Sequence, residues 1–469
     1  MTENKPNYEF DAYIKCDGIS SVLCDVALWL PKDADDDVRV RLNSPEKLDV
    51  IERFMGKSIS IESEIYQTNP QFSAKFINVR IKEISQQIDN RQLSRTKIKL
   101  LHVDELTIVE KIASQSADEI YFQISKLLYV EPDAWIVPDY LGNRKVEIRK
   151  NYSAKNSSGS QFKIEKHYSE YTDISPSKQI VSSQGIVTLV PEGKFNAEKI
   201  DSLYKEAKDF SLLLTFAARH QAMILGYEYR ASSERVRYFK NPTDRYRASQ
   251  EEVVKNALIP VEHFETYMNV ALEKWQTIDA KIKLAIKDAI YAIHPFNNSG
   301  QADYLTMFSA FEAIVNSRKT KINTEILENW TDIKKTFMAS IQALSVSAEA
   351  KHYFEENIEA LIYAEKFEKK AQFVLGDLKI QASDLWPIFG ENSMYKIRNN
   401  LAHGSRLKLD SVYMIARDQL QLLLERIILT LLGFDYDLST AGLRLHGMMC
   451  RYNLEEIREF QKQIKSNPN

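Results

Sequence analysis

The spacing of hydrophobic side chains changes part-way along this chain of 469 residues, and this change constrains the fold more than any other feature. Up to about residue 190 the dominant period is two. Ile59, Ile61 and Ile65, for example, alternate with polar residues, which is typical of half-buried strands. From about residue 196 the apolar residues recur every three or four positions, as in Ile200, Leu203 and Ala207. The sequence therefore predicts an α+β multidomain protein with a β-rich N-terminal module followed by an all-α helical bundle.

The length of the chain indicates more than one hydrophobic core, because a domain averages roughly 100–200 residues. We expect a β-rich sensing or regulatory domain over residues 1–195, a helix and linker over 196–250, and a helical domain over 251–469. The sequence NPTDRYRASQ marks the linker. Predicted strands cover parts of 8–30, 58–65, 77–82, 97–103, 119–130, 180–190, 223–229 and 235–239. Predicted helices cover 196–220, 263–275, 279–293, 302–318, 323–343, 348–369, 391–403 and 411–432, with a last one that begins at Asn453.

The charge and composition of the chain exclude several classes of function. With 62 basic and 65 acidic residues, the chain has a net charge of −3, so it lacks the overall basic field of a general nucleic-acid-binding protein. Any RNA binding must be local. The three cysteines, Cys16, Cys24 and Cys450, are spaced too widely for a metal cluster or a disulfide framework. Without a secretion signal or a long apolar run, the sequence predicts a cytoplasmic protein that does not contact a membrane. We expect neither a metal nor a cofactor.

The stretch YKIRNNLAHGS, from Tyr395 to Ser405, carries the candidate chemistry. On an ideal helix each residue advances by about 100°, which places Met394, Ile397 and Leu401 on one face as a buried stripe. By the same step, Arg398 lies about 40° and His403 about 180° from Met394. We therefore expect His403 to point away from the core.

Residue types in this stretch suit phosphoryl chemistry on RNA. Gly404 follows His403 and favours a helix end there. In a last turn the unpaired carbonyls carry partial negative charge, which suits an imidazole to hold and donate a proton. The guanidinium of Arg398 is a fixed planar cation that could stabilise a pentavalent phosphorane, while His403 moves a proton to or from the ribose hydroxyls. Such a reaction requires no metal.

At these residues the chain resembles the HEPN superfamily, whose RNA-cleaving members carry an arginine, a polar residue, three further residues and a histidine at the end of one helix. RNNLAH fits that form. A second stretch, YLTMFSAFEAIVNS from Tyr304 to Ser317, is similar to the aromatic and acidic helix of the Apea-like HEPN branch, with Glu312 at its acidic position. The resemblance covers roughly residues 257–469. Where some members have a tyrosine two residues after the histidine, this chain has Ser405.

The resemblance implies a HEPN-type helical bundle and a metal-independent endoribonuclease with Arg398, Asn399, His403 and Glu312 in the active site. It also implies a homodimer in which two such helices face each other across one cleft. The Apea-like branch implies an abortive-infection role against phage, with an infection-derived trigger and cellular RNA, tRNA among the candidates, as substrate. Lys396, Asn400, Arg406 and Lys408 are the expected RNA-binding residues around the site.

Two other interpretations stay open at the level of sequence. In the first, Arg398, Asn399 and the nearby lysines bind RNA or a nucleotide without breaking a bond. In the second, the helix is a scaffold and its outward face is a dimer seam. Glu312 lies on a mostly apolar helix and needs a polar partner, which Arg398 could supply, but it could also bridge within the bundle. A basic cluster that includes Arg235 and Arg237 is a secondary RNA-binding candidate, although a solvated charged face explains it more simply.

Overall fold

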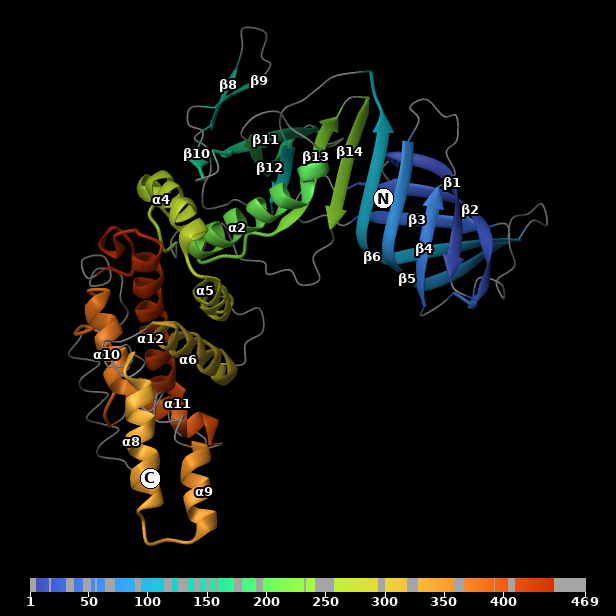
Figure 1. The fold of residues 1–469 in the computed structure, drawn as a ribbon. Helices are drawn as coiled ribbons and strands as arrows, with labels where there is room; N and C mark the ends of the chain where they lie inside the picture. The colour runs from blue at the N-terminus through green and yellow to red at the C-terminus, as the bar shows by residue number, and fades with distance from the viewer. Residues whose placement is uncertain are drawn as a thin grey trace. The chain divides into compact units, whose positions relative to one another are not determined.

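The structure, a computed structural model, describes residues 6–16, 18–30, 38–44, 52–54, 57–63, 72–88, 94–113, 120–124, 134–138, 144–148, 152–156, 159–172, 179–190, 197–231, 233–240, 257–293, 300–318, 328–357, 367–391, 393–403 and 410–442. The chain forms two compact units (Figure 1). The strand unit comprises Met1–Ala257 and Phe264–Glu273, and the helical unit comprises Leu258–His263 and Lys274–Asn469. Strands followed by helices confirm the predicted α+β fold class.

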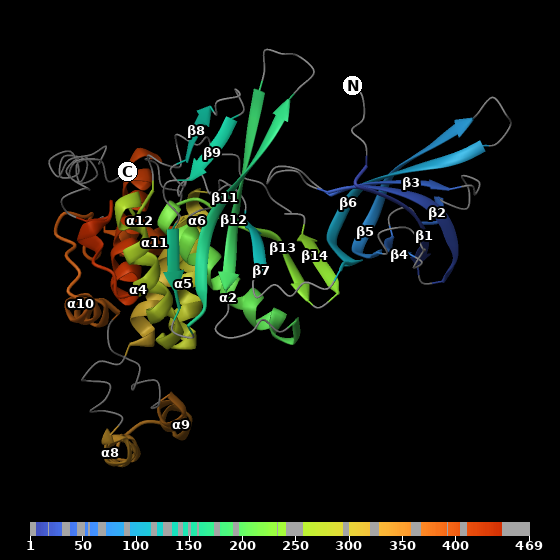
Figure 2. The same cartoon turned by 90° about the horizontal axis from the view of Figure 1, so that it is seen from above.

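The first six strands of the strand unit close on themselves (Figure 2). In pairing order they run β6-β3-β2-β1-β4-β5, every neighbouring pair is antiparallel, and β5 pairs back with β6. Alternate side chains fill the interior, among them Ile14, Val26, Leu42, Ile61 and Phe76. This is the buried face that the period of two predicted. The bounds are β1 Tyr8–Cys16, β2 Ile19–Trp29, β3 Arg39–Ser44, β4 Ser58–Ser63, β5 Phe72–Ile88 and β6 Ser94–Lys111.

The strand β6 also starts an open antiparallel sheet. Its first half pairs with β3, and its second half pairs on the same edge with β14, after which the order is β13-β7-β12-β11-β10. A separate hairpin joins β8 to β9. The bounds are β7 Ile120–Ile124, β8 Ala134–Pro138, β9 Arg144–Ile148, β10 Tyr152–Lys155, β11 Gln161–Thr172, β12 Gln179–Val190, β13 Ile224–Ala231 and β14 Glu234–Lys240.

The helix α2 (Ile200–Ala218) packs on the open sheet after a 3-10 turn, η1 (Ala197–Lys199). The Phe210 ring of α2 stacks on the Phe162 ring of β11 with centroids 4.6 Å apart, and Tyr204 stacks on Phe122 of β7. The helix α4 (Phe264–Thr277), preceded by η2 (Val261–His263), contributes its first ten residues to the same unit. There the Tyr267 hydroxyl donates to the Leu213 carbonyl.

The helical unit is built around α12 (Asp410–Leu431), whose buried face includes Leu420, Leu424 and Ile428. Packed with it are α5, α6 and α11. The remaining bounds are α5 Ala280–Ile293, α6 Gly300–Ser317, α8 Trp330–Gln342, α9 Ala348–Asn357, α10 Phe367–Asp377, α11 Met394–Ala402 and η4 Tyr436–Leu438. None of the described helices combines the length and apolar character that a membrane crossing requires.

Candidate active site

The helix α11 begins at Met394, within the predicted range of 391–403. Ser393 is fully buried and caps the helix, because its hydroxyl oxygen accepts a hydrogen bond from the Lys396 amide at 3.2 Å. Met394, Ile397 and Leu401 are buried, which confirms the predicted stripe. The opposite face of α11 is therefore left for solvent or a ligand.

The aromatic residues of the second sequence stretch hold α11 in place. The Tyr304 hydroxyl of α6 donates a 2.9 Å hydrogen bond to the Met394 carbonyl, in a fully buried position. Beside it, the Tyr395 ring packs on Phe308 of α6 and Phe367 of α10, with centroids 6.1 and 5.9 Å apart. Rings packed at such distances fix both the axial position and the rotation of a helix. The stretch from Tyr304 to Ser317 thus supports α11 directly.

The side chain of Arg398 lies between two acceptors. Its Nη2 donates to Glu312 Oε2 at 3.0 Å, and its Nη1 donates to Asn399 Oδ1 at 3.1 Å. The ion pair is partly exposed to solvent, since the Arg398 side chain is 31% exposed and that of Glu312 is 23% exposed. Of five guanidinium N–H groups, two are used within the described part of the chain. The remaining donors have no partner among the described residues.

His403 ends α11. Its backbone amide donates to the Asn399 carbonyl at 3.0 Å, and both His403 and the preceding Ala402 are exposed. The imidazole therefore faces outward, as the helical geometry predicts. Asn399, whose side chain orients Arg398 and whose carbonyl holds the His403 amide, links the two residues.

The structure describes two of the four expected RNA-binding residues. Lys396 is exposed and Asn400 is half-buried on α11, next to the residues of the candidate site. Arg406 and Lys408 lie outside the described residues, as do Gly404 and Ser405, so their positions stay predictions.

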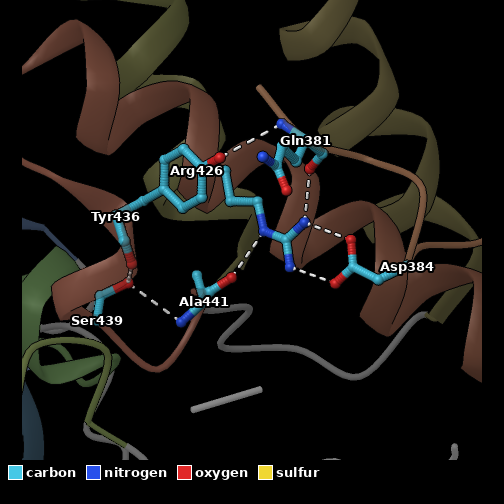
Figure 3. Close-up of polar contacts among 6 residues, drawn as sticks. All are labelled: Gln381, Asp384, Arg426, Tyr436, Ser439 and Ala441. Atoms are coloured by element: carbon cyan, nitrogen blue, oxygen red, sulfur yellow. Dashed lines mark hydrogen bonds and ion pairs between the residues drawn. The ribbon is translucent and has the colours of Figure 1, made fainter. Parts of the chain in front are cut away.

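One cluster that supports α11 was not foreseen (Figure 3). Arg426 of α12 is fully buried, and it makes a bidentate pair with Asp384 at 2.7 and 2.6 Å. Its remaining hydrogen bonds go to the carbonyls of Gln381 and Ala441. The Tyr436 ring lies 5.7 Å from the guanidinium carbon and its hydroxyl accepts from the Gln381 amide.

This buried cluster fixes the connection from α10 to α11. Asp384 and Gln381 both lie in that connection, and the carbonyls of Pro387 and Ile388 further along accept the amides of Met394 and Tyr395. The sequence signal was available, since Arg426 is a charge within the apolar run LLLERIILTLL and such a residue needs a buried partner.

The secondary basic candidate has internal partners. Arg235 makes a two-point contact with Glu228 at 2.8 Å, and Arg237 pairs with Glu110 at 2.9 Å. Both arginines are thus neutralised on the strands β13, β14 and β6. Among the described residues, no group of three or more His, Cys, Asp or Glu side chains is arranged to hold a metal ion.

Comparison of the chain with protein-family models, with curated proteins and with solved structures found no significant match. Any function assigned to the chain therefore depends on the geometry of α6 and α11.

Proposed function

We propose that this protein is a metal-independent endoribonuclease whose active site comprises Arg398, Asn399, His403 and Glu312. The observation that carries the proposal is the oriented Arg398 guanidinium, held by Glu312 and Asn399 with further donors available, on a helix that ends in an exposed imidazole. These are the two groups that transesterification of RNA requires.

In the proposed reaction the ribose 2′-oxygen attacks the adjacent phosphorus while the bond from phosphorus to the 5′-oxygen breaks. His403 takes the 2′-hydroxyl proton or donates a proton to the 5′-oxygen that leaves. The available N–H groups of Arg398 stabilise the charge on the non-bridging oxygens of the phosphorane. The products are a 2′,3′-cyclic phosphate and a 5′-hydroxyl end.

A second copy of α11 completes the proposed site. Arg398 and His403 are separated by about 140° around the helix, so a single scissile phosphate meets both more readily between two facing helices. We therefore propose a homodimer in which the exposed strip of α11 faces its equivalent. We place this activity in the cytoplasm as an anti-phage response, on the basis of the resemblance to the Apea-like branch.

The test is a cleavage assay with purified chain, cellular RNA and excess EDTA. His403→Ala should abolish product while it retains RNA binding, measured by fluorescence anisotropy. His352→Ala is the matched control, because His352 is also exposed and on a helix of the same unit, with Glu356 as its partner. The loss of activity should exceed about 100-fold, which is typical of a missing proton-transfer group.

Arg398→Ala should reduce cleavage by about 10²- to 10³-fold, as expected for the loss of a charge-stabilising donor. Arg318→Ala serves as its control, since Arg318 is 33% exposed and also pairs with a carboxylate, that of Asp377. Unchanged cleavage in His403→Ala contradicts the proposal. Loss of RNA binding in Arg398→Ala, with no cleavage by the wild type in any preparation, identifies a non-catalytic RNA-binding module instead.

A further inference from the structure

The helices α8 and α9 form an antiparallel hairpin in the helical unit (Figure 1). Ser347 caps the second helix, since its hydroxyl oxygen accepts the Ala350 amide at 3.2 Å. The Lys351 ammonium reaches across to the Gln342 carbonyl at 2.7 Å, and the Gln342 amide donates to Glu355. Among the described elements, the extensive contacts of these two helices are with each other. The hairpin is thus a defined element with open faces.

The hairpin exposes an unusual amount of apolar surface. Of eleven large hydrophobic side chains exposed among the described residues, five lie here: Phe337, Leu344, Val346, Tyr353 and Phe354. Tyr353 is 64% exposed, whereas Ile341 is the one buried hydrophobic residue of α8. A concentration of exposed aromatic and aliphatic side chains in one element is typical of an interaction surface.

The two helices carry opposite charge. Counting lysine, aspartate and glutamate, α8 has Lys334 and Lys335 against Asp332, a net charge of +1. The helix α9 has Glu349, Glu355 and Glu356 against Lys351, a net charge of −2. A surface with one basic and one acidic helix is complementary to itself after a two-fold rotation, because each helix then meets its opposite in the other copy.

We propose that two copies of this chain associate through the α8–α9 hairpin, with α8 of each copy on α9 of the other, to form a four-helix bundle. The exposed side chains of Phe337, Tyr353 and Phe354 are buried in the centre, and the lysines of α8 face the glutamates of α9 at the rim. This interface is distinct from α11, so it goes beyond the proposed ribonuclease activity and does not require it.

The proposal is tested by charge reversal in the full chain, with mass measured by sedimentation velocity. Lys334→Glu with Lys335→Glu makes both helices acidic, and Glu349→Lys with Glu356→Lys makes both basic. Each double variant should halve the mass of the wild-type assembly, with a dimer dissociation constant raised about tenfold or more. An equimolar mixture of the two variants restores attraction at both helix pairs, and should recover the wild-type mass.

A second experiment tests the apolar centre. Tyr353→Glu with Phe354→Glu should also halve the mass. The control is Leu284→Glu with Tyr291→Glu on α5, two side chains that are 61% and 46% exposed, which should leave the mass unchanged. Circular dichroism should show equal helix content in all variants.

Three results overturn the proposal. They are a wild-type chain that is monomeric at all concentrations, hairpin variants that keep the wild-type mass, and a variant mixture that does not recover it. The last two assign the hairpin to a different partner or to no partner. A monomeric wild-type chain would also contradict the proposed dimer through α11. The other two results concern the hairpin alone, because their readout is mass rather than RNA cleavage, and they leave the ribonuclease proposal to its own assay.

Discussion

Two arginines of the helical unit are each paired with a carboxylate, and their surroundings differ in an instructive way. Arg426 is fully buried, pairs with Asp384 through both ends of its guanidinium and donates to two carbonyls besides. Arg398 is 31% exposed and donates once to Glu312 and once to Asn399. Of the five guanidinium N–H groups, the buried arginine uses four and the partly exposed one uses two.

The difference separates a structural arginine from one that is available for chemistry. A buried guanidinium that already uses four of its five N–H groups and has no solvent contact is out of reach of a ligand, but the removal of its partner leaves an unpaired buried charge. A partly exposed guanidinium contributes little to stability because water screens its ion pair, and the remaining donors of Arg398 have no partner among the described residues. The same residue type thus has two different surroundings in the unit, and the proposed role of Arg398 depends on this difference.

Asp384→Ala should have the largest effect on stability. It strands the Arg426 charge inside the unit, and the loss of one partner of a buried pair costs about 3–5 kcal/mol. Urea unfolding followed by circular dichroism measures the change. The Asp435→Ala variant is a control, since Asp435 is an exposed carboxylate that caps η4 in the same region. Equal unfolding midpoints for Asp384→Ala and wild type would remove the contrast between the arginines.

Glu312→Ala should change stability by less than about 1 kcal/mol, as expected for a solvent-screened pair. It should lower RNA cleavage by about tenfold, because Arg398 then loses one of the two groups that orient it. Measuring both stability and RNA cleavage distinguishes the two arginine pairs, since Asp384→Ala should lower the free energy of unfolding and Glu312→Ala should lower the rate of cleavage. A Glu312 variant that unfolds as readily as the Asp384 variant would make both pairs structural.

Tyr304→Phe should cost about 1 kcal/mol, the value of one buried hydrogen bond to a carbonyl. The change removes the contact to Met394 without a cavity, so α11 loses one constraint while its aromatic packing remains. Thermal unfolding measures the effect, with Tyr291→Phe on the exposed face of α5 as the neutral control. No change would mean that the aromatic cluster alone fixes α11.

The smallest of the four effects concerns the stability of the strand unit, which should change at alkaline pH and not near neutral pH. Burial, followed by the neighbouring Tyr229 and Tyr204, raises the pKa of Tyr227 to about 12, and burial also raises the pKa of Tyr238. Because the folded-state pKa of Tyr227 exceeds the usual 10, its contribution to stability is complete below pH 10 and is lost as the pH rises through about 12. Urea midpoints between pH 9 and 12 should fall.

In the Tyr227→Phe variant the urea midpoint should fall less steeply between pH 9 and 12. A slope equal to that of the wild type would contradict the assignment of this fall to Tyr227. Arginine side chains keep their charge in proteins, so this titration separates the strand unit from the two arginine pairs.

Local patterns predicted much of the fold and of the site. The stripe of Met394, Ile397 and Leu401 and the outward direction of His403 follow from helical spacing, and the structure confirms both. The proximity of Glu312 to Arg398 was one of two alternatives, and the structure contains that contact. These features follow from the spacing of apolar side chains and from the need of the Glu312 carboxylate for a polar partner, and both can be read from the sequence.

Other features depend on contacts between distant segments. The short strand β3 and the polar strand β11 were not predicted, because they carry few apolar residues and are stabilised by pairing with their neighbours. Of the predicted helix over 348–369, the structure describes Ala348–Asn357 as α9 and the residues from Phe367 as the start of α10, while 358–366 lie outside the described residues. The predicted helix from Asn453 lies outside the described residues. The pair of Asp384 with Arg426 joins a loop to a helix 42 positions away, a distance that periodicity does not report.

The strand β6 has a mechanical consequence for the strand unit. One continuous backbone hydrogen-bonds to β5 along one edge and, in succession, to β3 and β14 along the other. Detachment of β6 would open the closed ring of strands, and it would also remove the strand that pairs with β14 of the neighbouring sheet. The two parts therefore share one unfolding barrier, and their amide protons should become exchangeable together.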